Sequence, residues 1–117
     1  MENNSERRWY CDFVYGLWDD DAGEFGPLFE CVNDTIACKK VVELLKGMVY
    51  EEFRKFGRVD ADNYKKYSLY SFGLYDRLEG VITPEKRLVE FESFKNSMIN
   101  KMEVMNNEAN ETVQKCK

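Results

Sequence analysis

The four cysteines are the side chains of this sequence best suited to covalent chemistry. The chain contains no histidine, which is the usual general base and the commonest metal ligand. An even number of cysteines in a chain of 117 residues is typical of two disulfide bonds formed in an oxidising compartment. The four are Cys11, Cys31, Cys38 and Cys116. The sequence has no C-x-x-C pair and lacks the commonest metal ligand, so we expect no metal site. The cysteines therefore predict a disulfide-bonded, secreted protein; the alternative is a cytosolic protein with four buried thiols.

Catalytic motifs are absent from the sequence. It contains no G-x-S-x-G, no phosphate-binding loop and no histidine to assist a cysteine nucleophile. Cysteines held in disulfides leave no thiolate, and no spacing selects two carboxylates for acid–base work. We therefore expect no enzymatic activity and no cofactor.

Acidic residues outnumber basic ones, 22 to 17, which gives a net charge of −5 and a pI near 4.9. This charge argues against nucleic acid as a partner, because that binding needs a cationic face. No apolar run approaches the roughly 18 residues of a membrane span. Asn3, Asn33 and Asn110 begin N-x-S/T triplets that favour secretion, although residues 1–8 lack the apolar core of a signal peptide. We expect a mature secreted chain.

The apolar residues recur at helical spacing, and this spacing predicts the elements that position the cysteines. Ser5 is typical of an N-cap, and the residues after it predict a helix over 6–20. Pro27 suits the first turn of a second helix, which Gly57 ends. The alternative to one continuous helix is an interruption at Asn33-Asp34-Thr35, since these residues favour caps over helix interiors.

Two further helices are predicted in the second half of the chain. A third helix is expected from about residue 60 to Gly80, although the alternation over Tyr67–Phe72 also fits a strand. Thr83 and Pro84 are typical of a helix start, and the apolar stripe that follows continues to Cys116.

Together these helices predict one domain over residues 1–117, an all-α, compact, disulfide-stapled four-helix-class bundle. If the first two helices form an antiparallel hairpin, Cys11 lies opposite Cys38, which leaves Cys31 to bond with Cys116. The alternative pairs Cys11 with Cys31 and Cys38 with Cys116. Either arrangement stabilises the fold by about 2–4 kcal/mol per bond.

Aromatic residues of the third segment are candidates for binding a partner. Tyr67 falls on the predicted inward stripe, whereas Tyr70 and Phe72 fall outside it. An outward aromatic ring beside a cation such as Arg77 is typical of an interface anchor. We therefore assign Tyr70, Phe72 and Arg77 to a partner-binding surface.

The acidic turn after the first predicted helix is a second candidate. Asp19, Asp20 and Asp21 stand together there, and exposed carboxylates speed encounter with a basic partner. A calcium loop beginning at Asp19 fails, because its sixth position is Glu24 where such loops need glycine. We therefore assign these three aspartates to partner binding and not to a metal.

Several features then combine: the tripeptide Trp9-Tyr10-Cys11 near the start, four cysteines, an acidic and aromatic-rich body, and the terminal Cys116. With its predicted helices, the chain resembles the anopheline mosquito salivary family that includes anophensin and the complement inhibitor albicin. The resemblance implies a secreted inhibitor of host defence that binds a host plasma protein complex. The implied target is the complement convertase of the alternative pathway, or a component of the contact system, and we expect a monomer.

A carrier is the alternative function. The helix-turn-helix pattern predicted around Leu74–Glu85 resembles that of insect odorant-binding and related salivary carrier proteins. That resemblance implies a small apolar ligand or a biogenic amine held between the helices.

Overall fold

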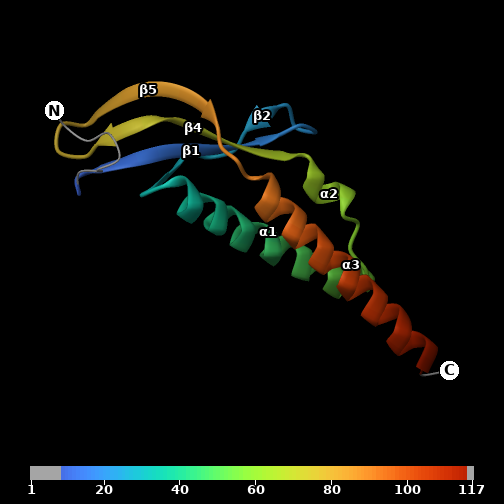
Figure 1. The fold of residues 1–117 in the computed structure, drawn as a ribbon. Coiled ribbons are helices and arrows are strands. Elements are labelled where there is room, and N and C mark those ends of the chain that lie inside the picture. Colours follow the sequence, from blue (N-terminus) through green and yellow to red (C-terminus); the bar gives the residue numbers. More distant parts are fainter. Residues whose placement is uncertain (1–8, 116–117) are drawn as a thin grey trace.

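The computed structural model describes residues 9–115, with side chains as far as Glu108, and the chain folds as a mixed α/β protein. A sheet of five antiparallel strands packs on two long helices (Figure 1). The predicted all-α, disulfide-stapled four-helix-class bundle is therefore wrong.

The elements run along the chain as follows: β1 (Cys11–Asp19), β2 (Glu24–Phe25), β3 (Phe29–Cys31), α1 (Asp34–Phe56), α2 (Asp62–Lys65), β4 (Tyr67–Asp76), β5 (Val81–Leu88) and α3 (Glu92–Lys115). The strand order is β2-β1-β4-β5, and β3 also pairs with β1. In Figure 1, α1 starts beneath one face of the sheet and α3 starts near the end of the sheet; the two helices run side by side and reach beyond it, and the molecule is 68 Å long. Among the described residues no helix covers the opposite face.

The first predicted helix is instead strand β1. Apolar and aromatic residues fill most positions of Cys11–Asp19, so a spacing of 3.6 and an alternation of 2 both fit the segment. Aromatic and β-branched residues favour the strand, and β4 supplies the hydrogen-bonding partner, with Gly16 opposite Tyr70. The expectation of a helix over 6–20 is wrong because local spacing alone does not reveal this distant partner.

Helix α1 confirms part of the second prediction. Its C-terminal end lies where expected, because Gly57 adopts φ 72° and donates its backbone N–H to Phe53 O at 2.8 Å. Its start lies later than Pro27, since the Asn33 side chain caps the helix by accepting from Ile36 N at 2.9 Å.

Strand β4 replaces most of the third predicted helix, so the strand alternative is the correct one. Tyr67, Leu69 and Ser71 are buried on the face toward the helices. Tyr70 and Phe72 alternate with them and lie half-exposed on the outer face. The outward placement of Tyr70 and Phe72 was right, although a period of 2 and not 3.6 produces it.

The predicted helix start at Thr83 and Pro84 is also wrong, because both residues lie in the edge strand β5. Proline is tolerated on an edge strand, where its missing N–H need not break a ladder. Pro84 stands opposite Gly73, which has φ 138° and lies beside a shift in register. A Cβ at Gly73 would lie 2.1 Å from Thr83 O, so only glycine permits this close approach.

The hydrophobic core lies between the inner face of the sheet and the two long helices. Its largest fully buried side chains include Tyr15 and Leu69 from the sheet, Leu45 from α1, and Phe91 and Met102 from the last third of the chain. Each of these removes a large apolar area from water, and this burial holds the sheet on the helices.

No disulfide joins Cys11, Cys31 and Cys38 among the described residues, and all three side chains are buried. The predicted Cys11–Cys38 bond is therefore absent, as is the alternative Cys11–Cys31 bond. Cys38 instead lies in the second turn of α1, where its Sγ faces Glu90 O at 3.8 Å. Cys116 lies outside the described residues, as do Ser5 and Asn3.

Candidate functional site

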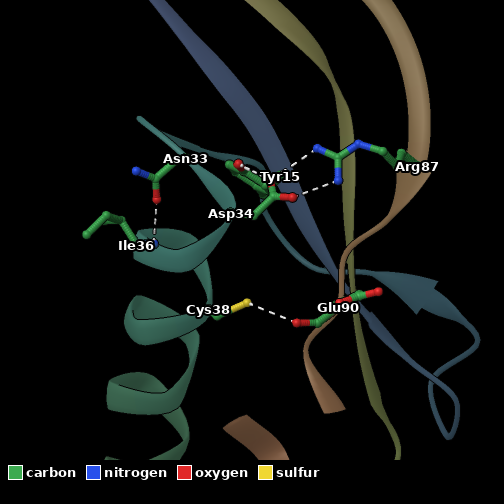
Figure 2. Close-up of polar contacts among 7 residues, drawn as sticks. All are labelled: Tyr15, Asn33, Asp34, Ile36, Cys38, Arg87 and Glu90. Atoms are coloured by element: carbon green, nitrogen blue, oxygen red, sulfur yellow. Dashed lines mark hydrogen bonds and ion pairs between the residues drawn. The ribbon is translucent and has the colours of Figure 1, made fainter. Parts of the chain in front are cut away.

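A polar cluster joins three elements where α1 begins (Figure 2). The hydroxyl of Tyr15 donates to Asp34 Oδ1 at 2.7 Å. Arg87 donates from Nη1 to Asp34 Oδ2 at 2.7 Å and from Nη2 to Asp34 Oδ1 at 3.1 Å. We call Tyr15, Asp34 and Arg87 the Asp34 cluster, and it ties the edge strand β5 and the central strand β1 to the first residue of α1.

The electrostatics of the Asp34 cluster fix its protonation states. The hydrogen bonds from Arg87 lower the pKa of the Asp34 carboxyl; burial opposes this effect, and the Tyr15 hydroxyl adds to it. Burial, followed by the hydrogen bond to Asp34, raises the pKa of Tyr15 above its ordinary value. Near neutral pH these shifts keep the Asp34 carboxyl ionised and the Tyr15 phenol protonated, so the two groups are not suited to exchanging a proton. The cluster is therefore suited to holding the fold together.

A recess of about 530 Å³ opens beside this cluster and includes Cys38, Glu90 and Ser93 in its wall. Burial, and then the charge of Asp34, raises the pKa of the Cys38 thiol. A nucleophilic cysteine needs a lowered pKa, because the thiolate is the reactive form. The Cys38 thiol therefore lies in the wall of the recess, but it is itself buried and its raised pKa favours the unreactive thiol form.

A second cluster lies on the outer face of the sheet, away from the helices. Phe25 is at its centre, with ring centroids 4.9 Å from Trp18, 4.9 Å from Phe72 and 5.4 Å from Tyr70. The rings meet edge to face, at interplanar angles of 62°, 80° and 88° in that order. We call these four residues the aromatic face, and all four are half-exposed.

Gly16 and Lys86 complete the surroundings of the aromatic face. A Cβ at Gly16 would lie 2.8 Å from Cε2 of Phe72, so the glycine makes room for the ring. The ammonium of Lys86 lies 5.4 Å from the ring centroid of Phe25 and 5.4 Å from that of Tyr70. Both distances are within the range of a cation–π interaction.

The acidic turn joins β1 to β2 at the border of the aromatic face. Asp19 Oδ1 accepts from the backbone N–H groups of Asp21 at 2.9 Å and Ala22 at 3.2 Å, which shapes the turn. Asp20 Oδ1 accepts from Trp18 Nε1 at 2.6 Å. Asp20 and Asp21 thus lie in a turn, as expected, whereas Asp19 is the last residue of β1, and the turn is linked directly to a ring of the aromatic face.

Arg77 does not lie beside Tyr70. It follows the end of β4, where its guanidinium binds the carboxylate of Asp12 and the carbonyl of Trp9. The cation at Tyr70 is instead Lys86 from the neighbouring strand. Sequence reasoning missed Phe25, Trp18 and Lys86, because strand pairing alone brings these distant segments together.

Among the side chains of residues 9–108, no group of three or more cysteine, aspartate and glutamate residues is arranged to hold a metal ion. No helix in this part of the chain is long and apolar enough to cross a membrane. Comparisons with known protein families, with curated proteins and with solved structures find no match for this chain.

Proposed function

We propose that the chain is a non-enzymatic protein-binding module that contacts its partner through the aromatic face. The observation that carries this proposal is a cluster of four half-exposed rings on a sheet face that no described helix covers. Tryptophan and tyrosine anchor protein interfaces because each buries a large apolar ring and keeps a polar tip. A rigid sheet holds these rings in place, so little entropy is lost on binding.

The face of the sheet is better suited to docking than its free edge. β5 is the edge strand, and an open edge is a template for adding a further strand. Pro84 interrupts this edge, the register shifts between Ser71 and Gly73 of its neighbour β4, and Lys86 adds a charge. Proline, charge and irregular pairing are the features that protect edges from strand addition.

A protein partner fits the aromatic face better than single-stranded nucleic acid does. Bases stack on exposed ring faces along a cationic groove. Here the rings pack edge to face on one another, and the acidic turn borders them. A phosphate backbone would be repelled by these carboxylates and by the net charge of −5.

A host plasma protein complex is the first target to test, since the resemblance drawn from the sequence implies that class. The helical body that contributed to the resemblance is absent from the fold, so the proposal rests on the aromatic face and not on the family. Complement-dependent haemolysis through the alternative pathway is the matching functional assay.

The test replaces Tyr70 and Phe72 by alanine, singly and together. Tyr50→Ala is the matched control, because Tyr50 is a tyrosine on α1 with 69% of its surface exposed. Wild type and variants are immobilised and exposed to plasma to measure how much partner each captures. The same proteins, in solution, are assayed for inhibition of complement-dependent haemolysis. We expect Tyr70→Ala and Phe72→Ala each to weaken binding by about 1–3 kcal/mol with little change in melting temperature.

Three results would contradict different parts of the proposal. Equal binding by the wild type and by the double variant would remove the aromatic face as the contact surface. Tight binding of a labelled single-stranded oligonucleotide would replace protein by nucleic acid as the partner class. Absence of any plasma ligand for the wild type would exclude the plasma target.

A further inference from the structure

The aromatic face already holds a cation in this structure. The Lys86 ammonium lies over two rings at once, 5.4 Å from the centroids of Phe25 and Tyr70. Lys86 is exposed, and its strand β5 is paired on one side only, so solvent reaches the ammonium. The position over these two rings is therefore both suited to a positive charge and accessible from outside.

The charges around this position favour a further cation. The exposed Asp20, which accepts a hydrogen bond from Trp18 Nε1, presents a carboxylate at one border of the rings. The chain as a whole carries a net charge of −5. Aromatic rings bordered by carboxylates attract a cation through the ring quadrupole and through the Coulomb field together.

We propose that the partner of the aromatic face is a basic protein segment, which places an arginine or lysine over Phe25 and Tyr70 where Lys86 now lies. This inference rests on the proposed function and names the chemistry of the partner. Lys86 is then an internal competitor, because the incoming cation must displace it from the two rings. Arginine suits the site well, since its planar guanidinium stacks on aromatic rings.

The probe for this inference is a fluorescein-labelled peptide of alternating arginine and serine. The control peptide carries citrulline in place of arginine, which keeps the shape of the side chain and removes its charge. Fluorescence anisotropy measures the affinity of both peptides for the full chain. We expect the citrulline peptide to bind about 2-fold to 30-fold more weakly per engaged ring site.

Three variants distinguish binding of a cation over the rings of Phe25 and Tyr70 from general electrostatic attraction to the chain. Lys86→Met removes the internal competitor, and we expect it to tighten binding of the arginine peptide by about 2-fold to 30-fold. Lys40→Met makes the same change in charge at an exposed position of α1, and we expect less than half of that effect. Phe25→Leu removes the central ring, and we expect weaker binding with an unchanged circular dichroism spectrum.

Each contrary result overturns the inference. Equal affinity for both peptides would exclude a cation as the recognised group. If Lys86→Met and Lys40→Met raised the affinity for the arginine peptide equally, the change in net charge would explain the increase, and displacement of Lys86 would be excluded. If Tyr70→Ala still abolishes capture of a protein partner while the arginine peptide fails to bind, the cationic partner is excluded and the protein-binding function stands.

Discussion

The two faces of strand β4 use the same types of residue for opposite purposes. Tyr67, Leu69 and Ser71 face the helices, and their exposed fractions are 8%, 0% and 2%. Tyr70 and Phe72, which alternate with them, lie half-exposed on the aromatic face. The residue type therefore does not reveal the role of a tyrosine here; the side of the sheet on which it stands decides between packing and recognition.

Carboxylates show the same contrast between the two faces. Asp34 is fully engaged by Tyr15 and Arg87 on the helix side of the sheet. Asp20 and Asp21 lie in a turn beside the aromatic face, where solvent reaches both. The first arrangement stabilises the fold. In the second, Asp21 pairs with Lys66 at 3.4 Å, and the exposed carboxylate of Asp20 is the charge available to a partner.

The sharpest test of this contrast compares neighbouring residues of β4. Leu69→Ala leaves a cavity in the core, and we expect the free energy of unfolding to fall by about 2–5 kcal/mol. Tyr70→Ala removes a ring from the outer face, and we expect a loss of about 1 kcal/mol or less. Chemical denaturation measures both values. Equal losses would show that Tyr70 belongs to the core, and the two faces would then not differ.

The Asp34 cluster offers the next largest effect. The Asp34 side chain is 38% exposed, so we expect Asp34→Asn to lower the free energy of unfolding at pH 7 by only about 1–2 kcal/mol. The folded pKa of Asp34 is lowered, so its contribution is present above the unfolded pKa of about 3.9 and is lost as pH falls through the folded pKa. Wild type and variant should converge in acid.

Glu43→Gln is the matched control for this change. Glu43 pairs with Lys46 at 3.2 Å on the exposed surface of α1, and such pairs contribute about 0.2–1 kcal/mol. A loss in Glu43→Gln as large as that in Asp34→Asn would mean that the Asp34 cluster is an ordinary surface ion pair.

The Tyr15 hydroxyl gives a smaller effect with the opposite dependence on pH. We expect Tyr15→Phe to lower the free energy of unfolding by about 1 kcal/mol at neutral pH, because one hydrogen bond to Asp34 is lost. The folded pKa of Tyr15 is raised, so its contribution is fully present below the unfolded pKa of about 10 and is lost as pH rises above it. A wild type that keeps its full advantage over Tyr15→Phe at strongly alkaline pH in denaturation curves would contradict this assignment.

The acidic turn carries the smallest effect on stability and a measurable one on rates. In Asp20→Asn with Asp21→Asn, the new amide at position 20 can still accept from Trp18, so we expect a change of about 0.5 kcal/mol or less. The association rate with the arginine–serine peptide should fall at low salt and match that of the wild type at high salt. Stopped-flow fluorescence measures the rate, and an unchanged rate with an unchanged salt slope would exclude steering by this turn.

Part of the architecture was predictable because it depends on local chemistry. Gly57 ends α1 and Asn33 interrupts the predicted helix as its cap, since both roles need only the conformational and hydrogen-bonding properties of one residue. The aspartates after Trp18 form a turn for the same reason. The inward position of Tyr67 and the outward position of Tyr70 were also predicted, although from the wrong period.

The remaining features depended on the tertiary structure. Where most positions are apolar, as in Cys11–Asp19, helical and strand periods fit equally, and the pairing of Gly16 with Tyr70 decides between them. The pairing of β2 with β1 and of β5 with β4 brings Phe25 and Lys86 to Tyr70, whereas Arg77 lies elsewhere. The cap at Asn33, the helix end at Gly57 and the turn after Trp18 could be predicted from the sequence, because each depends on the properties of a few neighbouring residues. Which rings and which cation share one face could be seen only in the tertiary structure. Hydrogen bonds between strands join segments that are distant in the chain, and the local sequence of each strand does not specify its partner.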